Sequence, residues 1–204
     1  MNKIITVGRQ FGSGGREVGR RLSEKLGIAY YDQEIISEIA KRTKLSEEYV
    51  KDVSKSRPVA SFPIHTGISL FNMPNPVFQQ SMVVYAEQHK ILRELADKSD
   101  CIIVGRCADY VLRDCDPFRI FVYADEAARL QRCMQRRLPD DQTNEREMKR
   151  KMAELDRNRA GYYSFFSGNK WGDKDNYDLM LNTTGKDIKS VTDALADYLR
   201  KVLY

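Results

Sequence analysis

Short apolar runs alternate with longer segments of helical periodicity along the whole chain. The apolar runs are typical of strands that are buried on both faces, and they lie at residues 4–7, 28–31, 101–104, 118–123 and 178–182. Helical spacing of apolar residues marks the segments at about 16–26, 77–98, 108–113, 124–138, 144–160 and 188–203, and two short helices at about 35–40 and after Ser46. This alternation predicts an α/β fold of three layers, in which a parallel sheet is flanked by helices.

A glycine-rich stretch, GRQFGSGGREVG at residues 8–19, joins the first predicted strand to the first helix. Glycines let backbone N–H groups approach an anion closely, and a helix N-terminus carries the positive end of the helix dipole. We therefore interpret the stretch as a phosphate-binding loop, with a plain strand-to-helix turn as the alternative. The strict P-loop pattern G-x-x-x-x-G-K-[ST] is not met, because Gly15 stands where the lysine belongs and Arg16 where Ser or Thr belongs.

Charged residues follow two other predicted strands. Arg106 comes after the strand at 101–104, and the carboxyl ends of parallel strands face the ligand crevice in such sheets. The position predicts an anion-binding arginine, with a surface arginine in a turn as the alternative. Asp32 ends the strand at 28–31, where it is interpreted equally as a substrate-binding carboxylate or as the N-cap of the next helix.

Two later helices carry further charged side chains at helical spacing. Arg129, Arg132 and Arg136 share one helix face, and three arginines on one face repel one another unless anions or acids lie opposite. A phosphate-facing role is favoured over a solvated surface stripe. Asp156 and Arg159 also share a face, which offers an acceptor for hydroxyls beside a donor fork for phosphate. The alternative for this pair is an intrahelical salt bridge.

Prolines and small polar residues break the helical pattern between residues 54 and 76. A loop of this length predicts a mobile flap near the substrate, and its apolar residues are interpreted alternatively as a homodimer contact. His65 lies within it and is interpreted as an ordinary loop histidine rather than a catalytic base. An aromatic cluster at 162–171, which follows the charged helix, is interpreted as closing a core rather than stacking a base.

Composition narrows the class of protein. A chain of 204 residues predicts one domain, and the absence of a long apolar run or a secretory signal predicts a cytoplasmic protein without a membrane span. The 4 cysteines lack zinc-site spacing, so reduced thiols are expected, two of them buried. The net charge of +5 is modest and acids are interspersed among the bases, which disfavours nucleic acid as the partner.

Taken together, these residues resemble a known family. The stretches ITVGRQFGSGG, IVGRCADYVL and LDRNRAGYY followed by YDLMLNTT are similar to the cytidylate kinase-like branch of the P-loop nucleoside monophosphate kinases. The resemblance implies transfer of the γ-phosphoryl group of ATP, with Mg²⁺, to a nucleoside monophosphate or a related small acceptor. It also implies one P-loop kinase-like domain over 1–204, with a core at about 1–32, 100–128 and 177–204, a substrate-binding insert at about 33–99 and a lid at about 129–176.

The resemblance implies roles for single residues as well. The donor nucleotide would be held by Gly12, Ser13, Gly14, Gly15, Arg16 and Glu17. The acceptor would be bound by Arg106, Asp156 and Arg159, with Asp156 accepting from ribose hydroxyls, and Asp32 and Asp109 are further candidates for acceptor binding from their positions in the sequence. Arg16, Arg132 and Arg159 would supply the catalytic charge, because phosphoryl transfer needs positioning and charge neutralisation rather than a nucleophilic side chain.

The sequence also departs from the family pattern. Cys107 stands where the family has an aspartate, and Glu38 and Met152 stand where it has arginines. Together with the absent loop lysine, these departures keep a second hypothesis open, a nucleotide-binding regulatory protein of the same fold without catalytic turnover.

Overall fold

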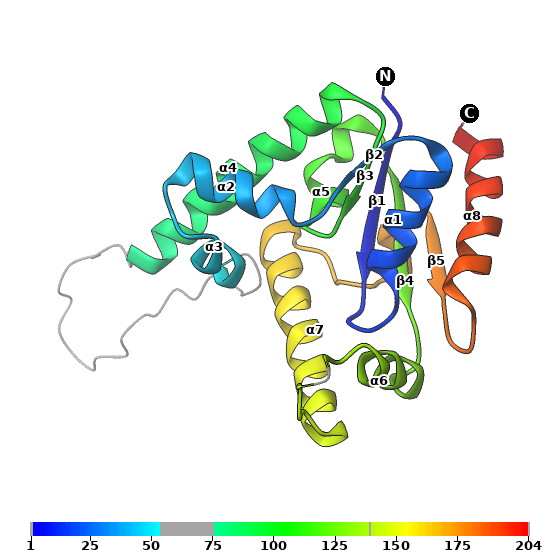
Figure 1. The fold of residues 1–204 in the computed structure, drawn as a ribbon. Helices are drawn as coiled ribbons and strands as arrows, with labels where there is room; N and C mark the ends of the chain where they lie inside the picture. Colours follow the sequence, from blue (N-terminus) through cyan, green and yellow to red (C-terminus); the bar gives the residue numbers. More distant parts are fainter. Residues whose placement is uncertain (1, 54–75, 139, 204) are drawn as a thin grey trace.

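A computed structural model describes residues 2–53, 76–138 and 140–203 of the chain. The predicted flap or homodimer contact at 54–76, with His65, therefore falls outside the described residues except for its last position. The described residues form a parallel sheet with helices on both faces (Figure 1). The strand order is β2-β3-β1-β4-β5, which confirms the predicted three-layer α/β fold.

The strands coincide closely with the apolar runs of the sequence. Every residue of β3 is buried, as expected for a central parallel strand that is covered on both faces. Ile5 and Ile102 face one layer of helices, and Ile4 and Ile103 face the other, because successive side chains of a strand point to opposite faces. The strand bounds are β1 (Ile4–Arg9), β2 (Ala29–Tyr31), β3 (Cys101–Val104), β4 (Phe118–Tyr123) and β5 (Leu179–Asn182).

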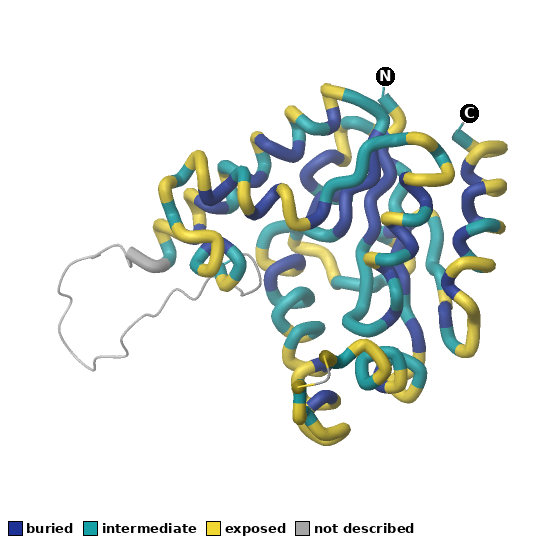
Figure 2. The backbone as a smooth tube through the Cα atoms, viewed as in Figure 1, coloured by how far each residue is buried: buried dark blue, intermediate teal, exposed yellow. Residues whose placement is uncertain are grey.

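Two layers of helices enclose the sheet, and its central strands β1, β3 and β4 carry the buried strand residues (Figure 2). The first layer consists of α1 (Gly15–Leu26) and α8 (Ile188–Leu203), which pack against each other. The second contains α2 (Glu34–Thr43), α3 (Glu47–Val53), α4 (Pro76–Lys98) and α5 (Ala108–Val111). A single 3-10 turn lies between α5 and β4 at Arg113–Cys115, and another precedes β5 at Lys174–Asn176.

Two further helices, α6 (Glu126–Gln135) and α7 (Glu145–Ser167), lie beyond the carboxyl end of the sheet, beside the β1–α1 loop (Figure 1). They occupy the segment for which a lid is predicted, and α2, α3 and α4 occupy the predicted substrate-binding insert. The division into core, insert and lid remains a prediction. None of the described helices is long and apolar enough to cross a membrane.

Two helix boundaries differ from the prediction. α7 continues to Ser167 rather than ending near 160, because its left-handed C-cap is Gly168 at φ +73°. The aromatic residues up to Phe166 therefore belong to the helix, whereas Trp171 follows it, and Phe166 stacks on Tyr85 of α4 with ring centroids 3.6 Å apart. This packing agrees with the core-closing interpretation. The helix that was expected over 124–138 ends at Gln135, with Arg136 as its C-cap.

Candidate active site

The glycine loop between β1 and α1 is held in one conformation by its own hydrogen bonds. Ser13 is buried, and its hydroxyl donates to the Gln10 carbonyl at 2.8 Å. The Thr183 hydroxyl, at the end of β5, donates to the Ser13 carbonyl at 2.7 Å. Gly12 and Gly14 adopt left-handed backbone conformations at φ +77° and +84°. The loop thereby leads directly into the N-terminal turn of α1, whose first N–H groups have no intrahelical acceptor and can bind an anion.

Replacing Gly14 with alanine tests this loop. We expect Gly14→Ala to lower the free energy of unfolding by about 2 kcal/mol, because a left-handed alanine costs roughly 1 to 2 kcal/mol and its Cβ would lie 2.6 Å from Ile188 Cδ1. The matched control is Gly27→Ala, where φ is +69° but nothing lies within 4 Å of the added Cβ. Urea unfolding should show a smaller loss for the control, and equal losses would contradict the tight loop packing.

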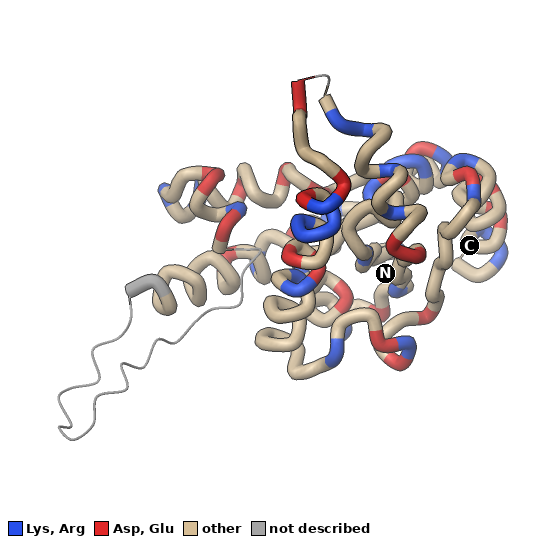
Figure 3. Tube along the Cα trace, turned by 90° about the horizontal axis from the view of Figure 1, so that it is seen from below, with Lys and Arg blue, Asp and Glu red and all other residues tan. Residues whose placement is uncertain are grey.

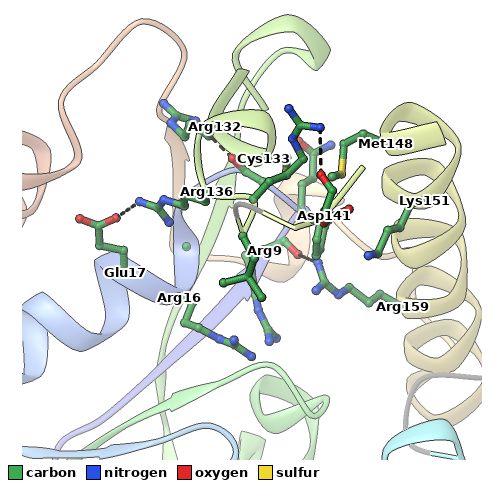
Figure 4. A pocket seen from close by; sticks show the side chains of 17 residues that line it. Arg9, Arg16, Glu17, Arg132, Cys133, Arg136, Asp141, Met148, Lys151 and Arg159 are labelled. Carbon is green, nitrogen blue, oxygen red and sulfur yellow. Dashed lines mark hydrogen bonds and ion pairs between the residues drawn. The ribbon is translucent and has the colours of Figure 1, made fainter. Parts of the chain in front are cut away.

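A first cleft of about 360 Å³ opens over the glycine loop. Its walls come from the loop, α1, α6, α7 and the segment between α6 and α7. Figure 4 shows Arg9, Arg16 and Arg159 converging on its centre from β1, α1 and α7. The lining residues include Gly12, Gly14, Gly15, Arg16, Glu17, Arg132, Arg136, Lys151 and Arg159. The cleft thus combines backbone donors with an excess of cationic side chains, as a polyphosphate site requires.

A second cleft of about 370 Å³ lies at the carboxyl end of β3. It is more aromatic than the first, and its own walls include Arg106, Cys107, Asp109, Tyr162, Tyr163, Trp171 and Tyr177. The two clefts share a set of lining residues, namely Arg9, Phe11, Arg16, Lys151 and Arg159. Two ligands bound in the two clefts would therefore meet beside four cationic side chains.

The arginines of α6 face the glycine loop and the acids around it. Arg129 pairs with Asp156 at 2.6 Å, and Arg136 pairs with Glu17 of α1. Arg132 donates to carbonyl oxygens of Thr183 and Gly12. Asp156 and Glu17 therefore lie opposite the arginine-bearing face of α6, and their negative charges offset the repulsion between its arginines. The solvated-stripe interpretation suits only Arg136, whose side chain is 60% exposed.

Asp156 connects α7 to the glycine loop. Its carboxylate accepts from the Phe11 backbone N–H at 2.7 Å, from Arg129 at 2.6 Å and from Arg159 at 3.3 Å. The intrahelical salt bridge to Arg159 is therefore present, but it is one contact among three. The role of Asp156 toward ribose hydroxyls remains a prediction.

Asp32 lies buried beneath the first turn of α1. Its carboxylate lies 2.5 Å from Arg16 Nε and 3.6 Å from Arg9 Nη2. The N-cap alternative is wrong, because α2 begins at Glu34 and Gln33 occupies the N-cap position. The Asp32 carboxylate instead orients two arginines at the junction of the clefts.

Arg106 projects into the second cleft from a constrained turn. Gly105, Arg106 and Cys107 all adopt left-handed conformations, at φ +74°, +61° and +54°. The buried Gln88 side chain of α4 donates to the Arg106 carbonyl at 2.9 Å and fixes the turn. Burial lowers the pKa of Arg106, and no ion pair joins it to a carboxylate within the described ranges. The surface-turn alternative is wrong for this side chain, which lines a cleft.

Asp109 lies at the wall of the second cleft and accepts a hydrogen bond from the Tyr163 hydroxyl at 2.8 Å. Burial raises the pKa of this carboxyl above its ordinary value of 3.8, although the bond to Tyr163 opposes the shift. A raised folded-state pKa means that the ionised carboxylate destabilises the fold above that pKa, and the cost vanishes below the unfolded value.

The sign of this shift leads to a prediction. We expect Asp109→Asn to be more stable than the wild type at pH 7, because the amide retains an acceptor for Tyr163 without a buried charge. The difference should narrow as the pH falls toward 4, where the wild-type carboxyl is protonated. Urea unfolding of both proteins at several pH values measures it. A difference in the free energy of unfolding that stays constant with pH would contradict the raised pKa of Asp109.

Arg9 and Lys151 line both clefts, yet the sequence does not single them out as site residues. A signal for Lys151 does exist, because Lys151, Leu155 and Arg159 recur at intervals of four and share one face of α7. No ion pair engages Lys151 in the part of the chain that the structure describes. Arg9 lies inside the glycine-rich stretch itself.

The cysteines are free thiols, with Cys101 and Cys107 buried as expected for two of them. In Figure 3, Lys and Arg positions are interspersed with Asp and Glu positions along the chain. Among the residues with a described placement, no group of His, Cys, Asp or Glu could hold a metal ion by itself.

The fold and the loop together define the class: an α/β protein of P-loop kinase-like fold, with a glycine-rich loop between its first strand and first helix. The chain belongs to the cytidylate kinase-like family, whose model matches residues 4–185. This membership confirms the resemblance that the sequence motifs indicate. No curated protein matches the chain.

Solved structures of similar fold include an uncharacterized protein from Eubacterium ventriosum. It is 25% identical, with 98% of this chain and 99% of that chain covered and a TM-score of 0.70. Shikimate kinase from Bacteroides thetaiotaomicron is 14% identical, with 97% and 98% covered and a TM-score of 0.56. Shikimate kinase from Acinetobacter baumannii, in complex with shikimate, is 16% identical, with 100% and 95% covered and a TM-score of 0.54. The two shikimate kinases establish similarity of fold alone.

Proposed function

We propose that the protein is an ATP-dependent phosphotransferase that acts on a nucleoside monophosphate or a related small acceptor. One observation carries the proposal: the cleft over the glycine loop and the cleft at the end of β3 meet along a shared cationic wall. A donor and an acceptor bound in these clefts would bring their phosphates together there. The proposal also implies a cytoplasmic location, where ATP is available.

In this proposal the residues of the first cleft bind the donor and those of the second cleft bind the acceptor. Backbone N–H groups of Gly14, Gly15 and Arg16 would hold donor phosphates, since they lie at the loop end and the first turn of α1. Arg106 and Arg159 would hold the anionic end of the acceptor. In the reaction the bond between the γ-phosphorus and its bridging oxygen breaks and a bond to an acceptor oxygen forms. ADP leaves, and the surrounding cations neutralise the charge of the transferred group.

The residues present fit a magnesium ion that arrives with the nucleotide. Mg²⁺ usually keeps several waters and is bound through one or two carboxylates together with substrate phosphates, so it needs no cage of protein ligands. Glu17, in the first turn of α1, lines the first cleft and would be a carboxylate of this kind, whereas Asp32 lines neither cleft and is paired with Arg16 and Arg9. When bound, the ion supplies charge neutralisation at the phosphates.

The second candidate function is nucleotide-dependent regulation without turnover. Gly15 in the place of the P-loop lysine is the observation that favours it, because the loop itself then contributes no cationic side chain at that position. Both functions require nucleotide binding and differ in whether an acceptor causes ADP release.

Calorimetric titration of the full-length protein with ATP and Mg²⁺ tests what the two functions share. We expect a dissociation constant in the range from about 1 μM to about 1 mM, as for typical enzyme substrates. The Gly14→Ala variant should bind more weakly, whereas the distant Gly27→Ala control should bind like the wild type. Absence of binding by the folded wild-type protein would contradict both functions.

A further inference from the structure

Position 15 has no room for a side chain, although its backbone conformation would allow one. It begins α1, and its φ is not in the left-handed region that favours glycine. A Cβ at position 15 would lie 2.5 Å from Cβ and 3.0 Å from Cγ of Arg9, closer than real side chains approach. The stem of Arg9 therefore occupies the room into which a P-loop lysine at position 15 would extend.

The head of the same side chain lies against a second glycine, Gly105, whose left-handed backbone at φ +74° by itself favours glycine. A Cβ on Gly105 would lie 1.7 Å from Arg9 Nη1 and 2.9 Å from Arg9 Cζ. The guanidinium of Arg9 thus lies against the backbone at the end of β3, directly before Arg106. It lines both clefts at their junction, and Figure 4 shows it beside the heads of Arg16 and Arg159.

The charge of Arg9 is poorly compensated by the protein. Its side chain is only 16% exposed, and the Asp32 carboxylate, 3.6 Å away, is shared with Arg16 at 2.5 Å. Burial, together with the neighbouring cations Arg159, Arg106 and Arg16, lowers the pKa of Arg9 to about 9. A buried cation surrounded by cations is costly, and an anion bound between them would offset that cost.

We propose that Arg9, from the end of the strand before the loop, supplies the cation that the loop omits at position 15 and contacts the phosphoryl group as it passes from donor to acceptor. This assignment rests on the proposed function for its chemistry. On this account the charge of the missing lysine has moved to Arg9, and Gly15 leaves the space that the stem of Arg9 requires.

The first test removes the charge while keeping much of the length. We expect Arg9→Gln to weaken ATP binding by about 10- to 100-fold, as for loss of a hydrogen bond to a charged group, and to lower acceptor-dependent turnover by about 100- to 1000-fold. Arg200→Gln is the charge-matched control, because Arg200 is an exposed residue of α8 that pairs with Asp197. Unchanged binding and turnover in a folded Arg9→Gln variant would overturn the assignment.

The second test moves the charge back to the position where the P-loop pattern has it. Gly15→Lys alone should lower both thermal stability and ATP affinity, because the new side chain meets the stem of Arg9. The double variant Arg9→Gly/Gly15→Lys removes both Arg9 Cβ and Arg9 Cγ and should bind ATP more tightly than Arg9→Gly. Equal affinity of this double variant and Arg9→Gly would count against the relocation.

Inorganic tripolyphosphate separates failure of this inference from failure of the proposed function. Wild-type binding of tripolyphosphate without ATP turnover, lost in Arg9→Gln, would reject the transferase and retain Arg9 as the phosphate-binding cation. Normal wild-type turnover that Arg9→Gln leaves intact would reject Arg9 and retain the transferase.

Discussion

Removal of the Asp156 carboxylate is expected to destabilise the protein by about 3 kcal/mol, because the change leaves two largely buried arginines without their acid. The side chains of Asp156 and Arg129 are only 15% and 13% exposed, so solvent compensates little for the lost partner. The Phe11 N–H of the glycine loop loses its acceptor at the same time. We therefore expect the Asp156→Ala variant to unfold at lower urea concentration and also to bind nucleotide more weakly than the wild type.

A surface ion pair provides the control for this prediction. Asp197 pairs with Arg200 on α8 at 2.8 Å, with side chains 72% and 49% exposed. Exposed pairs contribute about 0 to 1 kcal/mol, so Asp197→Ala should change the free energy of unfolding by less than about 1 kcal/mol. Similar urea midpoints for Asp156→Ala and Asp197→Ala would show that Asp156 does not fix α7 to the loop.

Replacement of Arg106 should separate donor binding from acceptor chemistry. Arg106→Met is expected to lower acceptor-dependent turnover by about 100- to 1000-fold while leaving the affinity for ATP close to that of the wild type. Arg106 lines only the second cleft, and both side chains have a Cβ, so the left-handed backbone at φ +61° penalises them similarly. Steady-state rates and calorimetry on the same preparations measure the two quantities.

The exposed Arg113 provides a matched arginine for this experiment. It follows α5, its guanidinium lies over the Tyr110 ring, and it lines neither cleft. Arg113→Met should therefore leave acceptor-dependent turnover unchanged. If Arg106→Met weakened ATP binding as strongly as it slowed turnover, the assignment of the second cleft to the acceptor would be wrong.

The architecture could be predicted from the sequence because its signals are local. A strand that is buried on both faces appears as an apolar run, as at 101–104, and the structure places β3 there. The sequence predicts that this helix ends near residue 160, because Gly161 interrupts the apolar pattern. The helix nevertheless continues to its cap at Gly168. A glycine inside a helix costs about 1 kcal/mol, which packing of the aromatic residues can offset.

The site could be predicted only where its residues follow a strand or belong to a motif. Arg106 and the glycine loop satisfy that condition, and both line the clefts. Arg9 satisfies it as well, since it ends β1 within the glycine-rich stretch, but the sequence does not show that its side chain reaches the backbone at the end of β3. The three contacts of Asp156 could not be anticipated either, since the Phe11 N–H that it accepts from lies 145 residues away along the chain.

The most direct test of the account is the release of ADP from ATP and Mg²⁺ by the wild-type protein, measured with and without each member of a panel of nucleoside monophosphates and small hydroxyl acceptors. The account predicts that at least one acceptor accelerates ADP release well above the rate with water alone, and that Arg106→Met abolishes this acceleration. Tight ATP binding with no acceleration by any acceptor would contradict the transferase and favour the regulatory alternative.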